Sequence, residues 1–110
     1  MKYLLLICTE GKPVENEDRP GDLDIDQWLE FVKDTRIIGE RVRPANESTT
    51  VRSRGGEVLV TDGPYVETKE QMAGFDIIDC KDLDEAIDIA SKHPVARFGM
   101  VEVRPFWGED

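Results

Sequence analysis

Residues 2–8, with the sequence Lys2-Tyr3-Leu4-Leu5-Leu6-Ile7-Cys8, decide the fold of this chain. The run is continuously apolar, but it is too short for a typical helix. A short apolar run of this kind is typical of a strand that is buried on both faces. We therefore predict that residues 2–8 form the central strand of a sheet, and the other elements are placed around it.

A long polar segment and then a helix are expected after this strand. Residues 10–22 contain two glycines and two prolines and predict a loop, which is either a lid or, as we favour, a tolerated insertion. Asp24 has the spacing to Gln27 of a capping box. The apolar stripe of Ile25, Trp28, Leu29 and Val32 predicts an amphipathic helix, and Gly39 is its expected end. Trp28 lies on this stripe, which favours core packing over ligand stacking.

The second half of the chain predicts a hairpin, a strand, a helix and a last strand. Residues 50–54 and 57–61 flank Gly55-Gly56, a pair suited to a two-residue turn. Residues 73–80 are expected to form a strand. A second helix should begin at Asp82, which has Glu85 three residues later, and should stop at Pro94. Residues 100–104 alternate in polarity and predict the last strand.

This order predicts a single α+β domain over residues 1–110, with a ferredoxin-like split βαβ arrangement, an antiparallel sheet and one extra strand. No internal repeat and no domain linker is found. Two helices cover one face of such a sheet, so the other apolar face needs a partner. We expect a homodimer built on a two-fold axis.

Composition excludes several classes of partner. The formal charge is −10 and no cluster of Lys and Arg occurs, which argues against nucleic acid and anionic membranes. The longest uncharged apolar run, Tyr3 to Thr9, is far shorter than the roughly 20 residues that span a bilayer, and it is not followed by a cleavage site. We expect a cytoplasmic protein with reduced, mostly inaccessible Cys8 and Cys80 and without a bound metal.

The candidate site lies in residues 61–70, with the sequence TDGPYVETKE. General motifs such as a phosphate-binding glycine loop or a zinc-binding histidine pair are missing. This segment instead concentrates carboxylates, a phenol and a lysine on a turn, where neighbouring charges shift one another's pKa. The candidates are Asp62, Tyr65, Glu67, Lys69 and Glu70. On composition alone a plain Asp-Gly-Pro turn is the favoured interpretation.

The segment from Val58 to Phe75, VLVTDGPYVETKEQMAGF, resembles the signature of the DGPF group of YCII-related proteins. The opening Lys2–Leu6, the segment Asp82–Ala86 and the ending Val101–Pro105 match the family pattern as well. The resemblance implies a dimeric α+β barrel and bacterial cytoplasmic proteins that are often encoded beside extracytoplasmic-function sigma factors. It implies no settled activity.

A related branch of the family carries a His–Asp pair proposed to be catalytic, and some of its members act on chlorinated aromatics. The Arg-Pro-x-His segment of that branch is absent here, so its mechanism cannot be transferred to this chain. Two positions depart from the usual motif: Tyr65 stands where Phe is common, and Ala73 stands where Gly is common.

His93 is the single histidine and precedes Pro94 at the end of the second predicted helix. A cation at a helix C-terminus is the plain interpretation, but the family pattern often has His-Pro here, and histidine is the natural proton carrier at neutral pH. One hypothesis is therefore a cofactor-independent lyase- or isomerase-like enzyme. Asp62 would act as acid or base, or would position His93 as the proton carrier. Lys69 and Arg104 would hold an anionic group, and Glu67 or Glu70 would tune Lys69.

Two other hypotheses remain open from the sequence. The same loop would serve a non-catalytic ligand-binding or regulatory module, associated with a sigma-factor system. In a purely structural alternative, the loop is a corner of the sheet and the protein is a dimeric scaffold.

Overall fold

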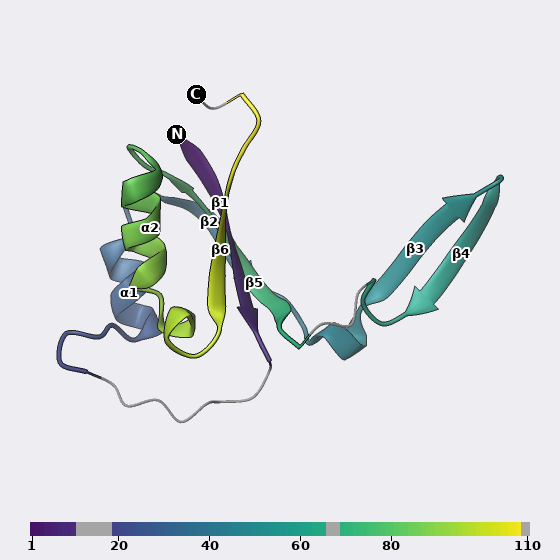
Figure 1. Cartoon of the computed structure of the whole chain (residues 1–110), viewed down its shortest axis with the longest axis horizontal. Helices are drawn as coiled ribbons and strands as arrows, with labels where there is room; N and C mark the ends of the chain where they lie inside the picture. The colour runs from purple at the N-terminus through teal and green to yellow at the C-terminus, as the bar shows by residue number, and fades with distance from the viewer. Residues whose placement is uncertain (11–18, 66–68, 109–110) are drawn as a thin grey trace.

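The computed structural model describes residues 1–10, 19–65 and 69–108 (Figure 1). Over these ranges the elements follow the order β1 (Lys2–Thr9), α1 (Ile25–Phe31), β2 (Arg36–Arg41), η1 (Ala45–Glu47), β3 (Thr49–Arg54), β4 (Glu57–Asp62), β5 (Gln71–Asp79), α2 (Leu83–Ser91), η2 (Pro94–Arg97) and β6 (Met100–Pro105). Most of the predicted 10–22 loop, and the centre of the 61–70 segment, lie outside the described residues.

The main sheet has four strands in the order β2-β5-β1-β6, and every neighbouring pair is antiparallel. Without the hairpin, the chain order is βαββαβ, and the predicted ferredoxin-like α+β fold is confirmed. Strand β1 is central, as expected, because it pairs with β5 on one side and β6 on the other. Both helices lie on one side of the sheet (Figure 1).

Strand β1 is more asymmetric than its sequence suggested. Tyr3, Leu5 and Ile7 point toward the helices and are buried, whereas Leu4 and Leu6 alternate with them and are only half-buried. The prediction of burial on both faces is therefore wrong for the single chain. Only the helix-facing side of the sheet is covered, because both crossover helices pack on that side.

The core forms between the helix-facing residues of the sheet and the apolar stripes of the helices. Trp28 of α1 is fully buried, and its indole Nε1 donates a hydrogen bond to the backbone oxygen of Ile89 in α2 at 3.0 Å. The core position predicted for Trp28 is confirmed. The helix starts are also as predicted. Asp24 and Gln27 form the reciprocal capping box, and the Asp82 carboxylate accepts a hydrogen bond from the backbone amide of Glu85.

The first helix ends much earlier than predicted. It stops at Phe31, and residues 36–41 form the edge strand β2 instead of continuing to Gly39. In residues 36–41, strand pairing with β5 outweighs the helix that the local sequence pattern predicts. Gly39 is a strand residue whose missing side chain makes room, because a Cβ at this position would overlap Asp76 Oδ1. The glycine therefore reflects a close approach between two strands, not a helix terminus.

The predicted hairpin forms around Gly55 and Gly56, both of which have positive φ. Its strands do not supply the extra strand of the main sheet, which corrects that part of the prediction. β3 and β4 pair only with each other in a separate two-stranded sheet. We call residues 49–62 the arm. Figure 1 shows the arm projecting from the side of the sheet opposite to the helices.

The second face of the main sheet, here called the open face, is largely apolar. The alternation and register of the strands place Leu4, Leu6, Phe75 and Ile77 on it, all partly exposed. Ile38, Met72 and Met100 extend it and are exposed. None of the helices in the described residues has the length and the hydropathy of a membrane span.

Candidate functional site

A cavity of about 540 Å³ lies between the helix layer and the β2–β5 edge of the sheet. α1 supplies Ile25, Trp28 and Leu29 to its wall, and the segment after α2 supplies His93 and Val95. The two sheet strands contribute Arg36 and Asp76. The wall is thus mostly apolar, with the carboxylate of Asp76, the guanidinium of Arg36 and the imidazole set into it, and Glu40 and Arg41 complete its charged lining residues. We call it the His93–Asp76 cavity.

Asp76 is a charged residue inside an otherwise apolar strand. It faces the helix layer, and only 8% of its side chain is exposed. Its Oδ1 accepts a hydrogen bond from Arg36 Nε at 2.7 Å, and in the described parts of the chain its Oδ2 accepts none. Burial raises the pKa of Asp76, and the neighbouring Arg36 opposes this by favouring the ionised form. The free carboxylate oxygen is left for a molecule in the cavity.

Gly39 permits this geometry. A methyl group at Gly39 would meet both Asp76 Oδ1 and the Arg36 guanidinium, the latter at 2.5 Å. The three residues lie on paired strands, since Gly39 is the register partner of Asp76 and Arg36 lies three residues earlier on β2. The ion pair therefore occupies the volume that any other residue at position 39 would fill.

His93 is 5% exposed and lies edge-on to the Trp28 ring, with ring centroids 4.6 Å apart. Its Nδ1 accepts the Val95 amide at 3.0 Å and so caps the N-terminus of η2. Burial, assisted by the positive charge of Arg97, lowers the pKa of His93 to about 4. The ring is neutral at pH 7, and with Nδ1 accepting, its proton is on Nε2.

This finding corrects the plain interpretation of His93. The expected role was that of a cation at the C-terminus of α2, but α2 ends at Ser91 and the imidazole is uncharged at neutral pH. A neutral imidazole with its proton on Nε2 is a hydrogen-bond donor. In a mostly apolar cavity that also holds a carboxylate, it can stabilise negative charge on a bound oxygen.

The described site candidates of the 61–70 segment, which are Asp62, Tyr65, Lys69 and Glu70, do not line this cavity. Asp62 ends β4 at the base of the arm, where it is exposed and pairs with Thr49. Tyr65 is also exposed, and its ring lies under the guanidinium of Arg52 at 5.2 Å. Glu67 lies outside the described residues.

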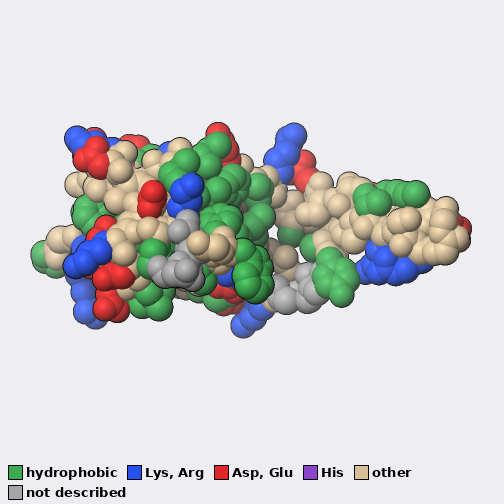
Figure 2. Space-filling view, turned by 90° about the horizontal axis from the view of Figure 1, so that it is seen from above, with side chains coloured by type: hydrophobic (Ala, Val, Ile, Leu, Met, Phe, Trp, Pro, Cys, Tyr) green, Lys and Arg blue, Asp and Glu red, His purple; other side chains and the backbone are tan. Residues whose placement is uncertain are grey.

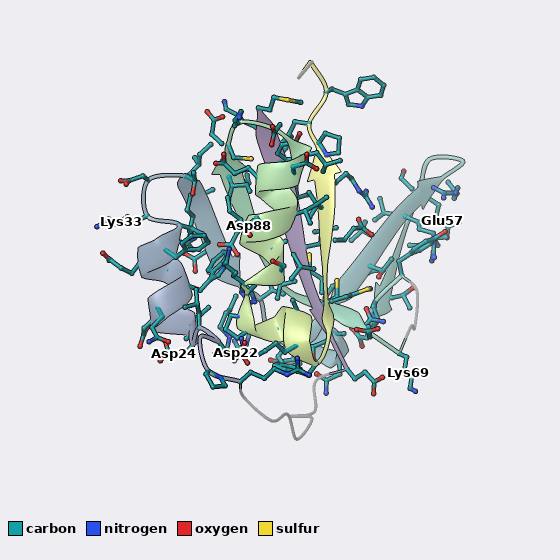
Figure 3. The ribbon with its side chains drawn as sticks, turned by 60° about the vertical axis from the view of Figure 1, so that its left-hand side comes forward. Asp22, Asp24, Lys33, Glu57, Lys69 and Asp88 are labelled. Atoms are coloured by element: carbon teal, nitrogen blue, oxygen red, sulfur yellow. The ribbon has the colours of Figure 1, made fainter. Side chains whose placement is uncertain are left out.

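Lys69 and Glu70 lie nearer to the body of the protein. Lys69 forms an ion pair with Glu10 at 3.7 Å, but its side chain is 86% exposed and points outward, below the arm, in Figure 3. Glu10 in turn lines a second cavity of about 450 Å³, at the end of β1. Glu70 is close enough to Cys8 to help raise the pKa of that thiol, after the larger effects of burial and Glu102.

Arg104 projects from β6 on the open face of the sheet, where it pairs with Glu102. It is therefore on the opposite side of the sheet from His93. Of the predicted site residues that the structure describes, only His93 lines the main cavity. The residues that accompany it there, Asp76 and Arg36, were missed in the sequence.

A signal for Asp76 was present in the sequence. It is a carboxylate between Phe75 and Ile77 in an apolar strand, and a buried charge generally needs a partner or a function. The signal for Arg36 was hidden, because the first helix was expected to continue to Gly39 and so to include this residue. Within the described residues, no group of three or more His, Cys, Asp or Glu side chains is arranged to hold a metal ion.

The two cysteines are free thiols. Cys80 is buried, as predicted, and burial raises the pKa of its thiol. Cys8 is only half-buried, because it lies on the open face.

The fold and the cavity define a small ferredoxin-like α+β protein that encloses a carboxylate and a neutral imidazole in one apolar pocket. The chain belongs to the YCII-related domain family, whose family model matches residues 1–108. It is also similar to an uncharacterised protein of Rhizobium meliloti (strain 1021), with 48% identity over 67 residues. The match covers 59% of this chain and 54% of that protein, so the chain spans about half the length of the curated relative.

Proposed function

We propose that this protein is a cofactor-independent enzyme of the lyase or isomerase type, which moves a proton on a small molecule bound in the His93–Asp76 cavity. The observation that supports this proposal is the cavity itself. It holds a buried carboxylate with a free oxygen and a buried neutral imidazole, and the pKa values of both groups are shifted from their usual values. Shifted pairs of this kind are typical of acid–base sites. The cavity replaces the 61–70 segment as our candidate site.

The roles follow from the protonation states. Asp76 Oδ2 accepts a proton from a carbon next to a carbonyl group, and its raised pKa makes it a stronger base. The electrons of the broken C–H bond move into an enolate, whose oxygen accepts a hydrogen bond from His93 Nε2. The proton then returns to another carbon, which is an isomerisation, or the enolate expels a neighbouring leaving group, which is an elimination. Arg36 keeps Asp76 oriented through its Nε.

The walls of the cavity favour a mainly apolar molecule with one polar end. Ile7, Leu29 and Phe98 contribute apolar surface, while Arg41 adds a second guanidinium to the lining. Arg41 is exposed and makes no ion pair with another described residue. A carboxylate on the ligand would suit this position, because a guanidinium binds a carboxylate through two parallel hydrogen bonds.

The test is proton exchange. The protein is incubated in D2O with a panel of small carbonyl acids, and deuterium incorporation is followed by NMR. We expect exchange in at least one compound, and loss of it in Asp76→Asn. Asp79→Asn is the matched control, because Asp79 lies on the same strand with a side chain 55% exposed. Binding without exchange would instead favour the ligand-binding module, and exchange that survives Asp76→Asn would contradict the assigned base.

We further propose that the protein is a two-fold homodimer of the DGPF group, with the open faces of two sheets packed together. The apolar surface of Leu4, Leu6, Phe75 and Ile77 supports this arrangement, since sheets normally have both apolar faces covered. The Val58–Phe75 motif supports the group assignment. Light scattering at micromolar concentration should give twice the chain mass of 12.5 kDa, and a value near 12.5 kDa would contradict the dimer.

A further inference from the structure

Among the described residues, the arm packs on neither the helices nor the main sheet (Figure 1). Its strands pair with each other, and the bonds at its base close the hairpin on itself: Thr50 Oγ1 donates to the Gly63 oxygen, and the Gly63 amide donates to the Ser48 oxygen. Figure 1 shows the arm standing clear of the helices and the main sheet. A two-stranded hairpin on its own is only marginally stable in water. The arm therefore needs a further packing contact to be stable.

The two faces of the arm differ in chemistry. The register pairs Val51 with Val60 and Ser53 with Val58, so three valines share one face. Val51 and Val60 are each 63% exposed, and Val58 is 64% exposed. The other face carries the pairs Arg52–Leu59 and Arg54–Glu57. Figure 2 shows this division, with hydrophobic side chains along one edge of the arm and Lys or Arg side chains along the other.

We propose that the valine face of the arm (Val51, Val58 and Val60) packs on a second copy of this chain, so that the arm of each subunit contacts the other subunit of the dimer. This inference rests on the dimer proposed above. The arm leaves the body on the side of the open face (Figure 1), so a subunit packed on that face lies beside the arm. One partner subunit then covers both the open face of the sheet and the valine face of the arm. In a two-fold dimer the same contact forms twice, which doubles its effect.

The charge distribution favours the same partner. The arm, residues 49–62, has a formal charge of 0, because Arg52 and Arg54 balance Glu57 and Asp62, whereas the whole chain has −10. Two bodies with a strongly negative charge repel each other, but the neutral arm adds nothing to this repulsion, and its two arginines are attracted by an acidic second copy. The arginines lie on the face opposite to the valines, so they remain at the rim of the contact, where charges guide association without being buried.

The first test compares variants on the two faces of the arm. Val58→Thr and Val60→Thr together replace a methyl group by a hydroxyl at two positions of the valine face while keeping β-branched side chains. Leu59→Thr is the matched control, because Leu59 lies between them on the opposite face. We expect the dimer dissociation constant, measured by analytical ultracentrifugation, to rise at least tenfold in the double variant and less than threefold in the control.

The second test uses the unmodified protein. Isotope-filtered NOEs are recorded on a mixture of labelled and unlabelled chains, where a signal arises only between subunits. Valine methyl signals of the arm should show such NOEs. A dimer without them, whose affinity also tolerates the valine substitutions, would overturn the arm contact while leaving the sheet-face dimer intact and the arm free for another protein. A monomeric parent would overturn both the arm contact and the dimer, but not the proton-transfer activity.

Discussion

The buried imidazole of His93 should make the protein less stable in mild acid. The native pKa is about 4, against an ordinary value of 6.5. As the pH falls below 6.5, the unfolded chain binds a proton at this position and the folded chain does not. The free energy of unfolding therefore falls with pH through this window and stops falling near pH 4, where the folded state is protonated as well. The full difference is about 3 kcal/mol, at about 1.4 kcal/mol for each unit of pKa.

Asp76 in the same cavity has the opposite effect. Its pKa is raised in the folded state, so the folded chain takes up this proton before the unfolded chain does as the pH falls. Its contribution is fully present below the ordinary pKa and is lost as the pH rises through the folded value. The pH dependence of the free energy of unfolding of the parent therefore contains contributions from both groups. The comparison with His93→Gln isolates the contribution of the imidazole.

Urea unfolding of the parent and of His93→Gln between pH 7 and pH 4 measures the difference. We expect the parent to lose about 3 kcal/mol more than the variant over this range. The native pKa can also be measured directly, because the chain has a single histidine and its imidazole NMR signals need no further assignment. A titration midpoint near 6.5, or parallel stability curves for the two proteins, would refute the burial argument.

Three other outcomes follow from the structure. Gly39→Ala should displace the Arg36–Asp76 pair and lower stability by about 1–3 kcal/mol in thermal melting, and an unchanged melting temperature would contradict the close approach of β2 and β5. Asp62→Asn should change the free energy of unfolding by less than about 0.5 kcal/mol, because the residue is exposed; a clear loss in urea titration would mean that the turn depends on its charge. In thiol labelling of the native protein, Cys80 should react only on unfolding, and Cys8 should react faster at protein concentrations low enough to dissociate the proposed dimer; a rapid reaction of Cys80 would contradict its burial.

Much of the fold was predictable because it depends on local patterns. The capping residues Asp24 and Asp82 mark where each helix begins, and they do so through hydrogen bonds to residues three positions away. The glycine pair at 55–56 specifies the hairpin turn in the same local way. Strand β1 is recognisable from its apolar run alone. Such signals survive in the sequence because both partners of each interaction are close neighbours along the chain.

The edge strand β2 was not predictable from local pattern. Residues 36–41 have little of the alternation that marks a strand, and they follow an amphipathic stripe directly. Their conformation is set by pairing with β5, more than thirty residues later. Gly39 illustrates the ambiguity: the same residue suits a helix terminus and a close strand contact, and only the position of Asp76 decides between them.

The sequence by itself determined the ferredoxin-like α+β class and the family, and it singled out His93 as a candidate site residue. The tertiary structure alone decided which groups accompany it. Asp76 and Arg36 line the same cavity as His93 but come from strands far away in the chain, whereas Asp62, in the most conspicuous motif, lies on the arm outside the cavity. The physical reason is that a site depends on the register of distant strands and on burial. Both arise when the sheet and the helices pack, and neither is encoded in the spacing of residues along one segment.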